Sequence, residues 1–226
     1  MTGIIIQARM GSKRFPNKMV MPLSGIPIID WVVRRVKKVK LADKIILATS
    51  NQAENDILVN RAIGYGMDIF RGDENDVLGR FTSAATDFEL DTILRVCGDN
   101  PLSCPEEIDK LIAFYREVEP DYAFNGVPKM GNRYPDGLGA EITSYRILES
   151  LNDKVIDIDE REHVFLHIWR NSGDYMIKTF PAADSIAYPE IRLDVDTPDD
   201  LDYLESFDFH IEDSATKIIR KVIHDR

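Results

Sequence analysis

The residues from Gln7 to Lys18 combine four cationic side chains with a glycine and a serine, directly after the apolar run 3–6. Arginine presents a planar fork that binds phosphate oxygens in pairs, and lysine adds a mobile point charge. Glycine lets backbone N–H groups approach an anion closely. This combination is typical of a polyphosphate pocket, although a basic loop can also be an ordinary solvated surface.

Two features favour the pocket. The chain of 226 residues carries a formal net charge of -11 with a pI of about 4.9, so a basic cluster runs against its background. The cluster also follows a predicted buried strand, and α/β sheets bind their ligands at the carboxyl ends of strands.

Acidic side chains follow two other predicted strands. Asp99 comes directly after 92–97, and Asp194 and Asp196 end the run 191–195. Strand ends of a parallel sheet share one edge, so we expect these acids to meet the basic loop there. Carboxylates beside a polyanion repel it unless a cation lies between them, and Mg²⁺ bridges carboxylate and phosphate oxygens. The sequence therefore predicts a metal–nucleotide site.

Each acid also has a purely structural interpretation. Asp99 precedes Pro101, and aspartate is common in turns. Asp196 precedes the expected helix start at Thr197 and Pro198, where an acid favours the helix dipole. The residue types leave both alternatives open.

Elements that would position these residues alternate along the chain. This alternation predicts an α/β protein with a mostly parallel sheet covered on both faces. We expect strands at 3–6, 44–49, 67–70, 92–97, 175–180 and 191–195. Helices are expected at 28–40, 53–63, 77–88, 105–117, 145–151 and 159–171, and from 198 and 214.

Composition and length favour one domain, 1–226. Hydrophobic residues make up 44% of the chain, enough for a sizeable core. Residues 126–139 hold four glycines and two prolines, so an arm or lid insertion is expected roughly at 126–145. Strong acidity argues against a nucleic-acid partner. No apolar run suits a membrane span or signal peptide, which leads to the expectation of a cytoplasmic protein with Cys97 and Cys104 as free thiols.

Six motifs in one order give the chain a family resemblance. The first is 5–18, Ile-Ile-Gln-Ala-Arg-Met-Gly-Ser-Lys-Arg-Phe-Pro-Asn-Lys, and the others lie at 76–81, 98–102, 134–138, 161–164 and 193–201. The series resembles the cytidylyltransferase family that includes spore coat polysaccharide biosynthesis protein F. It is more distantly similar to the acylneuraminate and 3-deoxy-manno-octulosonate cytidylyltransferases.

The resemblance implies a nucleotide-diphospho-sugar transferase fold, a three-layer α/β/α sandwich with a small dimerisation arm. It also implies CMP transfer from CTP to a small acidic acceptor with Mg²⁺ and release of pyrophosphate, in a homodimer. Arg9 and Lys18 would be catalytic, and Asp99 and Asp196 would bind the metal. The residues that would hold the nucleotide are Gln7, Ala8, Arg9, Gly11, Ser12, Arg14, Lys18, Thr49, Ser50 and Arg80.

Acceptor-binding candidates come from the later motifs: Asn125, Tyr134, Asp136, Glu141, Arg161 and His163. Those in the irregular segment could equally form a lid or dimer contact. His163 could instead be a helix-surface histidine. With His167 it has zinc-binding spacing, but no third ligand supports a zinc site.

The chain departs from the family pattern twice. The family commonly has glycine where Asn17 stands, and asparagine can adopt positive φ. Gly139 stands where the family usually has aspartate, which predicts a different acceptor or weak acceptor binding. Two other functions remain: a metal-dependent glycosyltransferase using a nucleotide sugar, and a non-catalytic nucleotide-binding protein. The basic loop favours a triphosphate substrate over the nucleotide sugar that a glycosyltransferase would use. The retained Arg9, Lys18, Asp99 and Asp196 argue against a non-catalytic protein.

Overall fold

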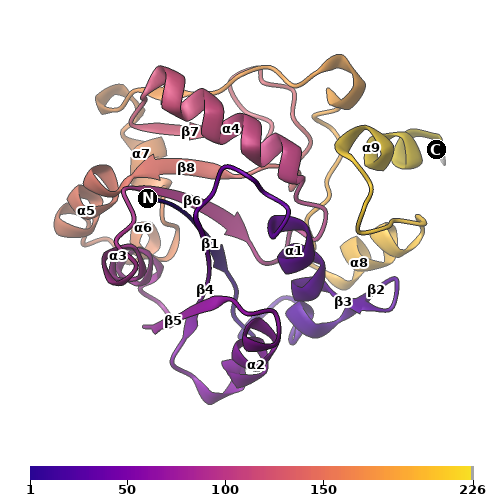
Figure 1. Cartoon of the computed structure of the whole chain (residues 1–226), viewed down its shortest axis with the longest axis horizontal. Coiled ribbons are helices and arrows are strands. Elements are labelled where there is room, and N and C mark those ends of the chain that lie inside the picture. The colour runs from indigo at the N-terminus through magenta and orange to yellow at the C-terminus, as the bar shows by residue number, and fades with distance from the viewer. Residues whose placement is uncertain (225–226) are drawn as a thin grey trace.

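A seven-stranded sheet forms the middle layer of the protein (Figure 1). The computed structural model describes residues 1–224, and the strand order is β5–β4–β1–β6–β8–β7–β9. Four of the six neighbouring pairs are parallel, and β8 runs antiparallel to both β6 and β7. The strands are β1 (Thr2–Gln7), β4 (Lys44–Ser50), β5 (Asp68–Gly72), β6 (Thr92–Cys97), β7 (Tyr122–Phe124), β8 (Glu141–Ser144) and β9 (Ile177–Lys178).

Helices cover both faces of this sheet, which confirms the predicted three-layer α/β/α sandwich. The α-helices are α1 (Ile28–Val36), α2 (Asp56–Gly64), α3 (Val77–Asp87), α4 (Pro105–Val118), α5 (Tyr145–Lys154), α6 (Ile158–Glu162), α7 (Leu166–Arg170), α8 (Pro198–Glu205) and α9 (Ala215–His224). Short 3-10 turns lie at Lys18–Val20 (η1), Ala53–Asn55 (η2), Ser172–Asp174 (η3) and Asp184–Ile186 (η4), and β2 (Pro22–Leu23) pairs with β3 (Ile26–Pro27).

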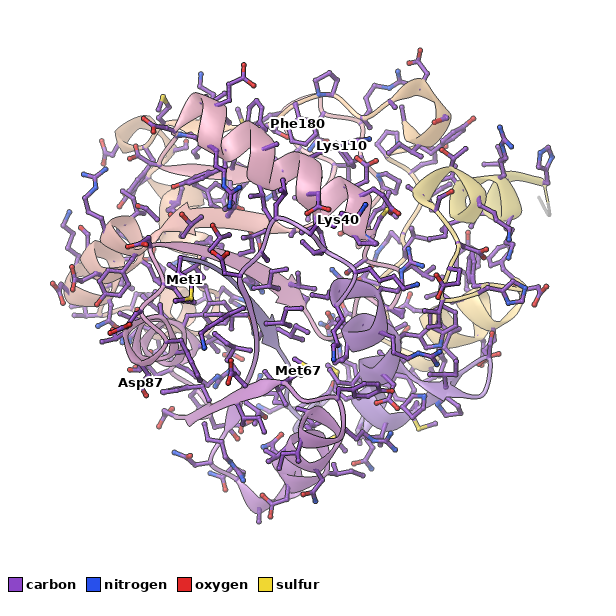
Figure 2. All side chains as sticks on the ribbon, in the orientation of Figure 1. Met1, Lys40, Met67, Asp87, Lys110 and Phe180 are labelled. Atoms are coloured by element: carbon purple, nitrogen blue, oxygen red, sulfur yellow. The ribbon has the colours of Figure 1, made fainter. Side chains whose placement is uncertain are left out.

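Alternating side chains of β1 divide the core between the two faces. Ile4 and Ile6 pack with α1, α2 and α4, whereas Ile5 packs with α3, α5 and α7. Side chains fill the space between the layers in Figure 2, where Phe180 lies against α4. Its ring packs on Phe114 with centroids 4.9 Å apart. A third cluster joins α8 and α9 to Trp31 of α1, beside the carboxyl edge of the sheet.

Most expected elements are confirmed within one to four residues at each end. The weak candidate at 67–70 is a full strand, β5, paired in parallel with β4. Pro105 opens α4, and Asp76 caps α3 by accepting a hydrogen bond from the backbone N–H of Gly79. Thr197 and Asp200 form a reciprocal capping box at α8. Local residue chemistry decides these boundaries.

The second half of the chain differs from the expectations. Residues 191–195 form no strand and make one isolated bridge, Asp136 to Arg192. Their backbone groups instead pair with the neighbouring 134–138 and 98–99 segments, since Leu193 donates to Asp136 and Val195 to Asp99. The expected helix 159–171 is split at His163, whose φ of -110° and ψ of 83° break the helical path.

Two short antiparallel strands were not expected at all. Strand β7 has three residues and β8 has four, too few for a clear period. Strand β8 fills the place between β6 and β7, inside the interval expected as an arm. Residues 126–140 before it run along the body of the protein, with Asn132, Tyr134 and Leu138 buried. Within residues 1–224 no helix has both the length and the apolar content needed to cross a bilayer.

Candidate active site

A cavity of about 650 Å³ lies at the carboxyl end of β1. The basic loop forms one wall, and the ends of β6 and α6 form the others. The structure thereby brings together most of the residues predicted for the nucleotide. The cavity is lined by Gln7, Ala8, Arg9, Gly11, Ser12, Lys13, Arg14, Lys18, Met19, Glu74, Asn75, Val77, Arg95, Cys97, Asp99, Glu162, His163 and Asp196.

Local contacts fix the shape of the basic loop. The backbone N–H of Met10 donates to Oδ1 of Asn55 at 2.8 Å, and Asn55 in turn donates to Oγ of Ser50 at 2.7 Å. Asn17 adopts the left-handed conformation with a φ of 62°, so the expectation that asparagine preserves this turn is confirmed. The turn starts η1 and points Lys18 into the protein, where its side chain is 8% exposed.

Lys18 lies between the two predicted metal ligands. Its Nζ donates to Asp99 Oδ2 at 2.6 Å, to Asp196 Oδ1 at 3.2 Å and to the carbonyl of Val195 at 3.0 Å. Burial lowers the Lys18 pKa, but the two carboxylates more than offset burial, and the pKa lies above its ordinary value. Lys18 therefore stays a cation.

The contacts of Asp99 and Asp196 distinguish a structural role from a role in the cavity. Asp196 contacts Lys18 and Arg14, the latter at 3.1 Å, while Thr197 caps α8. Asp99 likewise directs its carboxylate at Lys18 rather than at its own turn. Both side chains therefore face the cavity.

Arg9 is held by two acids at the other side of this cavity. Its guanidinium lies 2.8 Å from Glu162 and 3.3 Å from Glu74. Arg80 supports this arrangement from below, because its Nη1 donates to the backbone carbonyls of Asp73 and Glu74. Arg80 is a positioning residue for the segment that holds Arg9.

Thr49 and Ser50, also predicted to hold the nucleotide, lie behind the cavity wall as Arg80 does. Thr49 and Ser50 are buried at the end of β4 and do not line the cavity, and neither does Arg80. Ser50 acts through Asn55 on the loop, as described above. Oγ1 of Thr49 and Nε and Nη2 of Arg80 are buried without hydrogen-bond partners among the described residues.

A second cavity of about 360 Å³ adjoins the first. The two share a wall made of Arg95, Cys97, Asp99, His163 and Asp196. The second cavity alone is lined by Asn100, Gly126, Val127, Lys129, Asp136, Gly139, Ala140, Glu141, Phe165, Leu166, Trp169 and Asp194. The carboxylates beside Lys18 thus stand where the two cavities meet.

Asp136 is a carboxylate of the second cavity with an altered proton affinity. Burial, followed by the nearby charge of Asp194, raises the pKa of Asp136 to about 6. Asp194 itself is paired with Arg192 at 2.5 Å. No ion pair to Asp136 is formed among residues 1–224. Asp136 is therefore free to meet a ligand in this cavity.

Three predicted acceptor residues are taken up by internal contacts. Asn125 is fully buried and donates to the carbonyl of Glu107 while accepting from the N–H of Ala140. Tyr134 is buried as well, and its hydroxyl donates to Glu107 at 2.7 Å. Neither side chain lines either of these two cavities, so the structure separates both from the residues that do.

Arg161 is the third, and it joins three helices instead of facing a cavity. Its Nε and Nη2 donate to the two oxygens of Asp76, the cap of α3, at 2.9 and 2.8 Å. Its Nη1 and Nη2 also reach the carbonyl of Val155 and the side chain of Asn152 at the end of α5. These contacts fix α6, and hence Glu162 and His163, over the cavity.

His163 is the acceptor candidate that does reach the cavities, and it lines both. Its side chain is 61% exposed. His167 turns away and pairs with Glu160 at 2.6 Å. Cys97 also lines both cavities, but burial raises the pKa of its thiol to about 12, which keeps it protonated rather than nucleophilic.

Gly139 has a steric reason to be glycine. A Cβ atom there would overlap the backbone carbonyl and the side-chain amide oxygen of Asn125. Asn125 holds the N–H of Ala140, so it cannot move away without breaking that hydrogen bond. The family's usual aspartate does not fit this backbone.

Two carboxylates suit a metal ion that completes its coordination with a ligand. Asp99 and Asp196 both lie within 3.2 Å of Lys18 Nζ. Among residues 1–224 no group of three or more histidine, cysteine or acidic side chains could hold a metal alone. Mg²⁺ typically takes one or two carboxylates plus substrate phosphates, so this donor set fits it when a triphosphate is present.

Arg95 is a charged residue of both cavities that sequence reasoning missed. It lies on β6, donates to Oε1 of Gln7 and Oε2 of Glu141, and lines both cavities. The signal that could have revealed it is a charge inside an otherwise apolar strand, Ile93-Leu94-Arg95-Val96.

Comparisons with known proteins give matches over most of this chain. The family described as "Cytidylyltransferase" matches residues 3–220. An uncharacterised protein of Methanocaldococcus jannaschii is 34% identical over 89% of this chain and 81% of its own length. Spore coat polysaccharide biosynthesis protein SpsF of Bacillus subtilis is 31% identical over 89% and 84%, respectively. A solved cytidylyltransferase from Leptospira borgpetersenii superposes with a TM-score of 0.90 at 27% identity, covering 99% of this chain and 94% of the other.

Proposed function

The chain belongs to the cytidylyltransferase family, and from this we propose that it transfers CMP from CTP to a small acidic sugar or similar acid, releasing pyrophosphate. The observation that carries the proposal is the pair of adjoining cavities whose common wall holds Asp99 and Asp196. A transfer reaction needs two ligands whose reacting atoms meet. The cavity with the basic loop suits the triphosphate, and the second suits the acceptor.

In the proposed reaction an acceptor oxygen attacks the α-phosphorus of CTP in line with the leaving group. A new P–O bond forms, the bond from the α-phosphorus to the bridging oxygen breaks, and pyrophosphate leaves with that electron pair. Negative charge gathers on phosphate oxygens, so positioning and electrostatic stabilisation dominate. An acid that attacks through an already ionised oxygen needs no strong base.

The position of each residue in the cavities indicates its role in this reaction. Lys18, held in the first cavity by Asp99 and Asp196 of the shared wall, would stabilise charge on the α-phosphate. Arg9 would leave Glu74 and Glu162 to bind the triphosphate, with Gly11, Ser12 and Arg14 around it. Mg²⁺ held by Asp99 and Asp196 would neutralise phosphate charge when bound.

The acceptor set is narrower than the sequence predicted. We propose Asp136, Glu141 and His163 as acceptor-site residues, because all three line the second cavity. The family and the name of the Bacillus relative also support a role in surface polysaccharide or glycan biosynthesis. The family resemblance supports a homodimer, and two free cysteines with a nucleoside triphosphate substrate support a cytoplasmic location.

The test is pyrophosphate release with CTP, ATP, GTP and UTP against a panel of ulosonic acids and phosphonates, with and without Mg²⁺. The proposal expects release with CTP and at least one acid, abolished by a chelator. No release with any pair would refute it. Consumption of a nucleotide sugar without pyrophosphate would favour a glycosyltransferase instead.

A further inference from the structure

Arg95 forms part of the wall between the two cavities. Its side chain is 17% exposed, and that of its partner Glu141 is 15% exposed. Burial lowers the pKa of Arg95, but neighbouring acids including Glu141 more than offset this, so the pKa is raised and the guanidinium stays charged. A charged group at this depth is costly unless it is paired and hydrogen-bonded, as Arg95 is with Glu141.

Two of the three nitrogens of this guanidinium donate to protein side chains. Nε donates to Gln7 at 2.8 Å and Nη1 to Glu141 at 2.6 Å. Nη2 has no hydrogen-bond partner among residues 1–224, and it is not among the polar atoms that are enclosed without one. It is therefore open to the cavities.

The group behind Arg95 keeps it in place. Glu141 accepts from Arg95 with one oxygen and from the hydroxyl of Tyr122 with the other. Tyr122 is fully buried between aromatic rings, with Phe165 at a centroid distance of 5.0 Å and Trp169 at 5.7 Å. The guanidinium is thus a preorganised donor, the kind that binds a carboxylate without reordering.

Most of the other charged residues of the second cavity are acids. Asp136 and Asp194 line it together with Arg95, and carboxylates accept hydrogen bonds from hydroxyl groups. Asp99 and Asp196 of the shared wall contact Lys18, and Glu141 contacts Arg95. The cation Lys129 is also present, but its Nζ lies 4.2 Å from the centroid of the Trp169 ring. The cavity thus combines a fixed donor for an anion with acceptors for hydroxyl groups.

We propose that Arg95 selects the acceptor: its Nη2 binds the acceptor's carboxylate, while Asp136 and Asp194 receive its hydroxyl groups, so that a different oxygen points at the α-phosphorus. This assignment rests on the proposed CMP transfer and names a residue that determines its specificity for the second substrate. An uncharged sugar of the same shape would bind poorly.

The experiment compares acids with their methyl esters. Pyrophosphate release from CTP and Mg²⁺ is measured with 3-deoxy-manno-octulosonate and other ulosonic acids, each alongside its ester. The key variant is Arg95→Gln combined with Glu141→Gln, which leaves no unpaired buried charge and lets two amides hydrogen-bond. Arg116→Gln is the matched control, because Arg116 binds Thr2 and Leu41 away from the cavities. Thermal melting and CTP affinity show that each variant is folded and binds nucleotide.

Wild type is expected to prefer the acid over its ester. The double variant should raise KM for the acid about 10- to 100-fold, with kcat and CTP affinity within a few-fold, since one charge-assisted hydrogen bond is lost. Arg116→Gln should match wild type.

Three results would overturn the assignment. Equal use of acid and ester by wild type would show that Arg95 does not select charge, while CMP transfer itself would stand. An unchanged KM in the double variant, with a rise in Lys129→Gln, would place the acid at Lys129 instead. No pyrophosphate release by wild type with any pair would refute the transfer reaction and this inference together.

Discussion

Lys18 is the residue whose place explains most of the site. An ammonium group between two carboxylates keeps Asp99 and Asp196 close together without a ligand. A metal–triphosphate complex brings its own positive charge to those carboxylates, which would leave Lys18 free to contact phosphate oxygens. The same side chain therefore preorganises the metal ligands and supplies charge for catalysis.

Asp136 yields a prediction about stability as a function of pH. Its pKa is raised to about 6 in the folded protein, from an ordinary value near 3.8, so the native state binds this proton more tightly than the unfolded chain. Stability contributed by the neutral carboxyl is therefore present at acidic pH and is lost as pH rises through about 6. Asp136→Asn should raise the free energy of unfolding by about 1–2 kcal/mol at pH 7.5 after solvent screening is allowed for.

Urea unfolding at pH 4.0 and pH 7.5 measures this difference. At pH 4.0, where native Asp136 is mostly protonated, the variant and wild type should have nearly equal stability. Asp208→Asn, at an 87% exposed position, is the control and should change neither value much. Equal stabilisation at both pH values would contradict the assigned cause.

Arg161 connects the helices α3, α5 and α6, so its loss should destabilise their packing. Because it joins the cap of α3 to the end of α5 and to α6, Arg161→Gln should lower the free energy of unfolding by about 1–3 kcal/mol. The KM for the acceptor should stay within about two-fold of wild type, since a side chain outside both cavities contributes no direct binding.

The matched control is Arg170→Gln on the neighbouring helix. Arg170 is 45% exposed and pairs with acids on the surface of α6, so its loss should lower the free energy of unfolding much less than the loss of Arg161. Denaturant titration and acceptor kinetics on both variants separate the roles. Unchanged stability with a large rise in KM for Arg161→Gln would return Arg161 to the acceptor site.

Elements also determine how much of the site the sequence could predict. The basic loop and Asp99 were predictable, because each follows a strand whose apolar residues identify it. Asp196 was predicted from the apolar run 191–195, although that run forms no strand. Asp136 was found by motif resemblance, but its cavity was not, since that cavity depends on β8 and on long-range pairing of 134–138 with 191–193. The contacts of Arg161 were not predictable, because an exposed-looking helical arginine gives no sign of a partner 85 residues away.

Over the whole molecule the net charge is negative, but several cationic side chains gather in one cavity wall. The formal net charge is -11, yet Arg9, Lys13, Arg14 and Lys18 lie together in the basic-loop wall of the first cavity. An acidic body discourages polynucleotides, while the local cationic wall still attracts a small polyanion. The sandwich fold makes this separation possible, since strand ends concentrate functional groups at one edge of the sheet.

We propose that CMP transfer takes place beside Lys18 of the first cavity, at the wall with Asp99 and Asp196 that the two cavities share. The most direct measurement is the steady-state rate of CTP-dependent pyrophosphate release by wild type, Lys18→Ala and the surface control Lys40→Ala, labelled in Figure 2, with the best acid from the panel. We predict that kcat for Lys18→Ala falls by roughly one to three orders of magnitude, as for loss of a charge-stabilising donor, while Lys40→Ala keeps wild-type activity. Wild-type kcat in a folded Lys18→Ala variant would contradict the proposed role of Lys18 in the transfer.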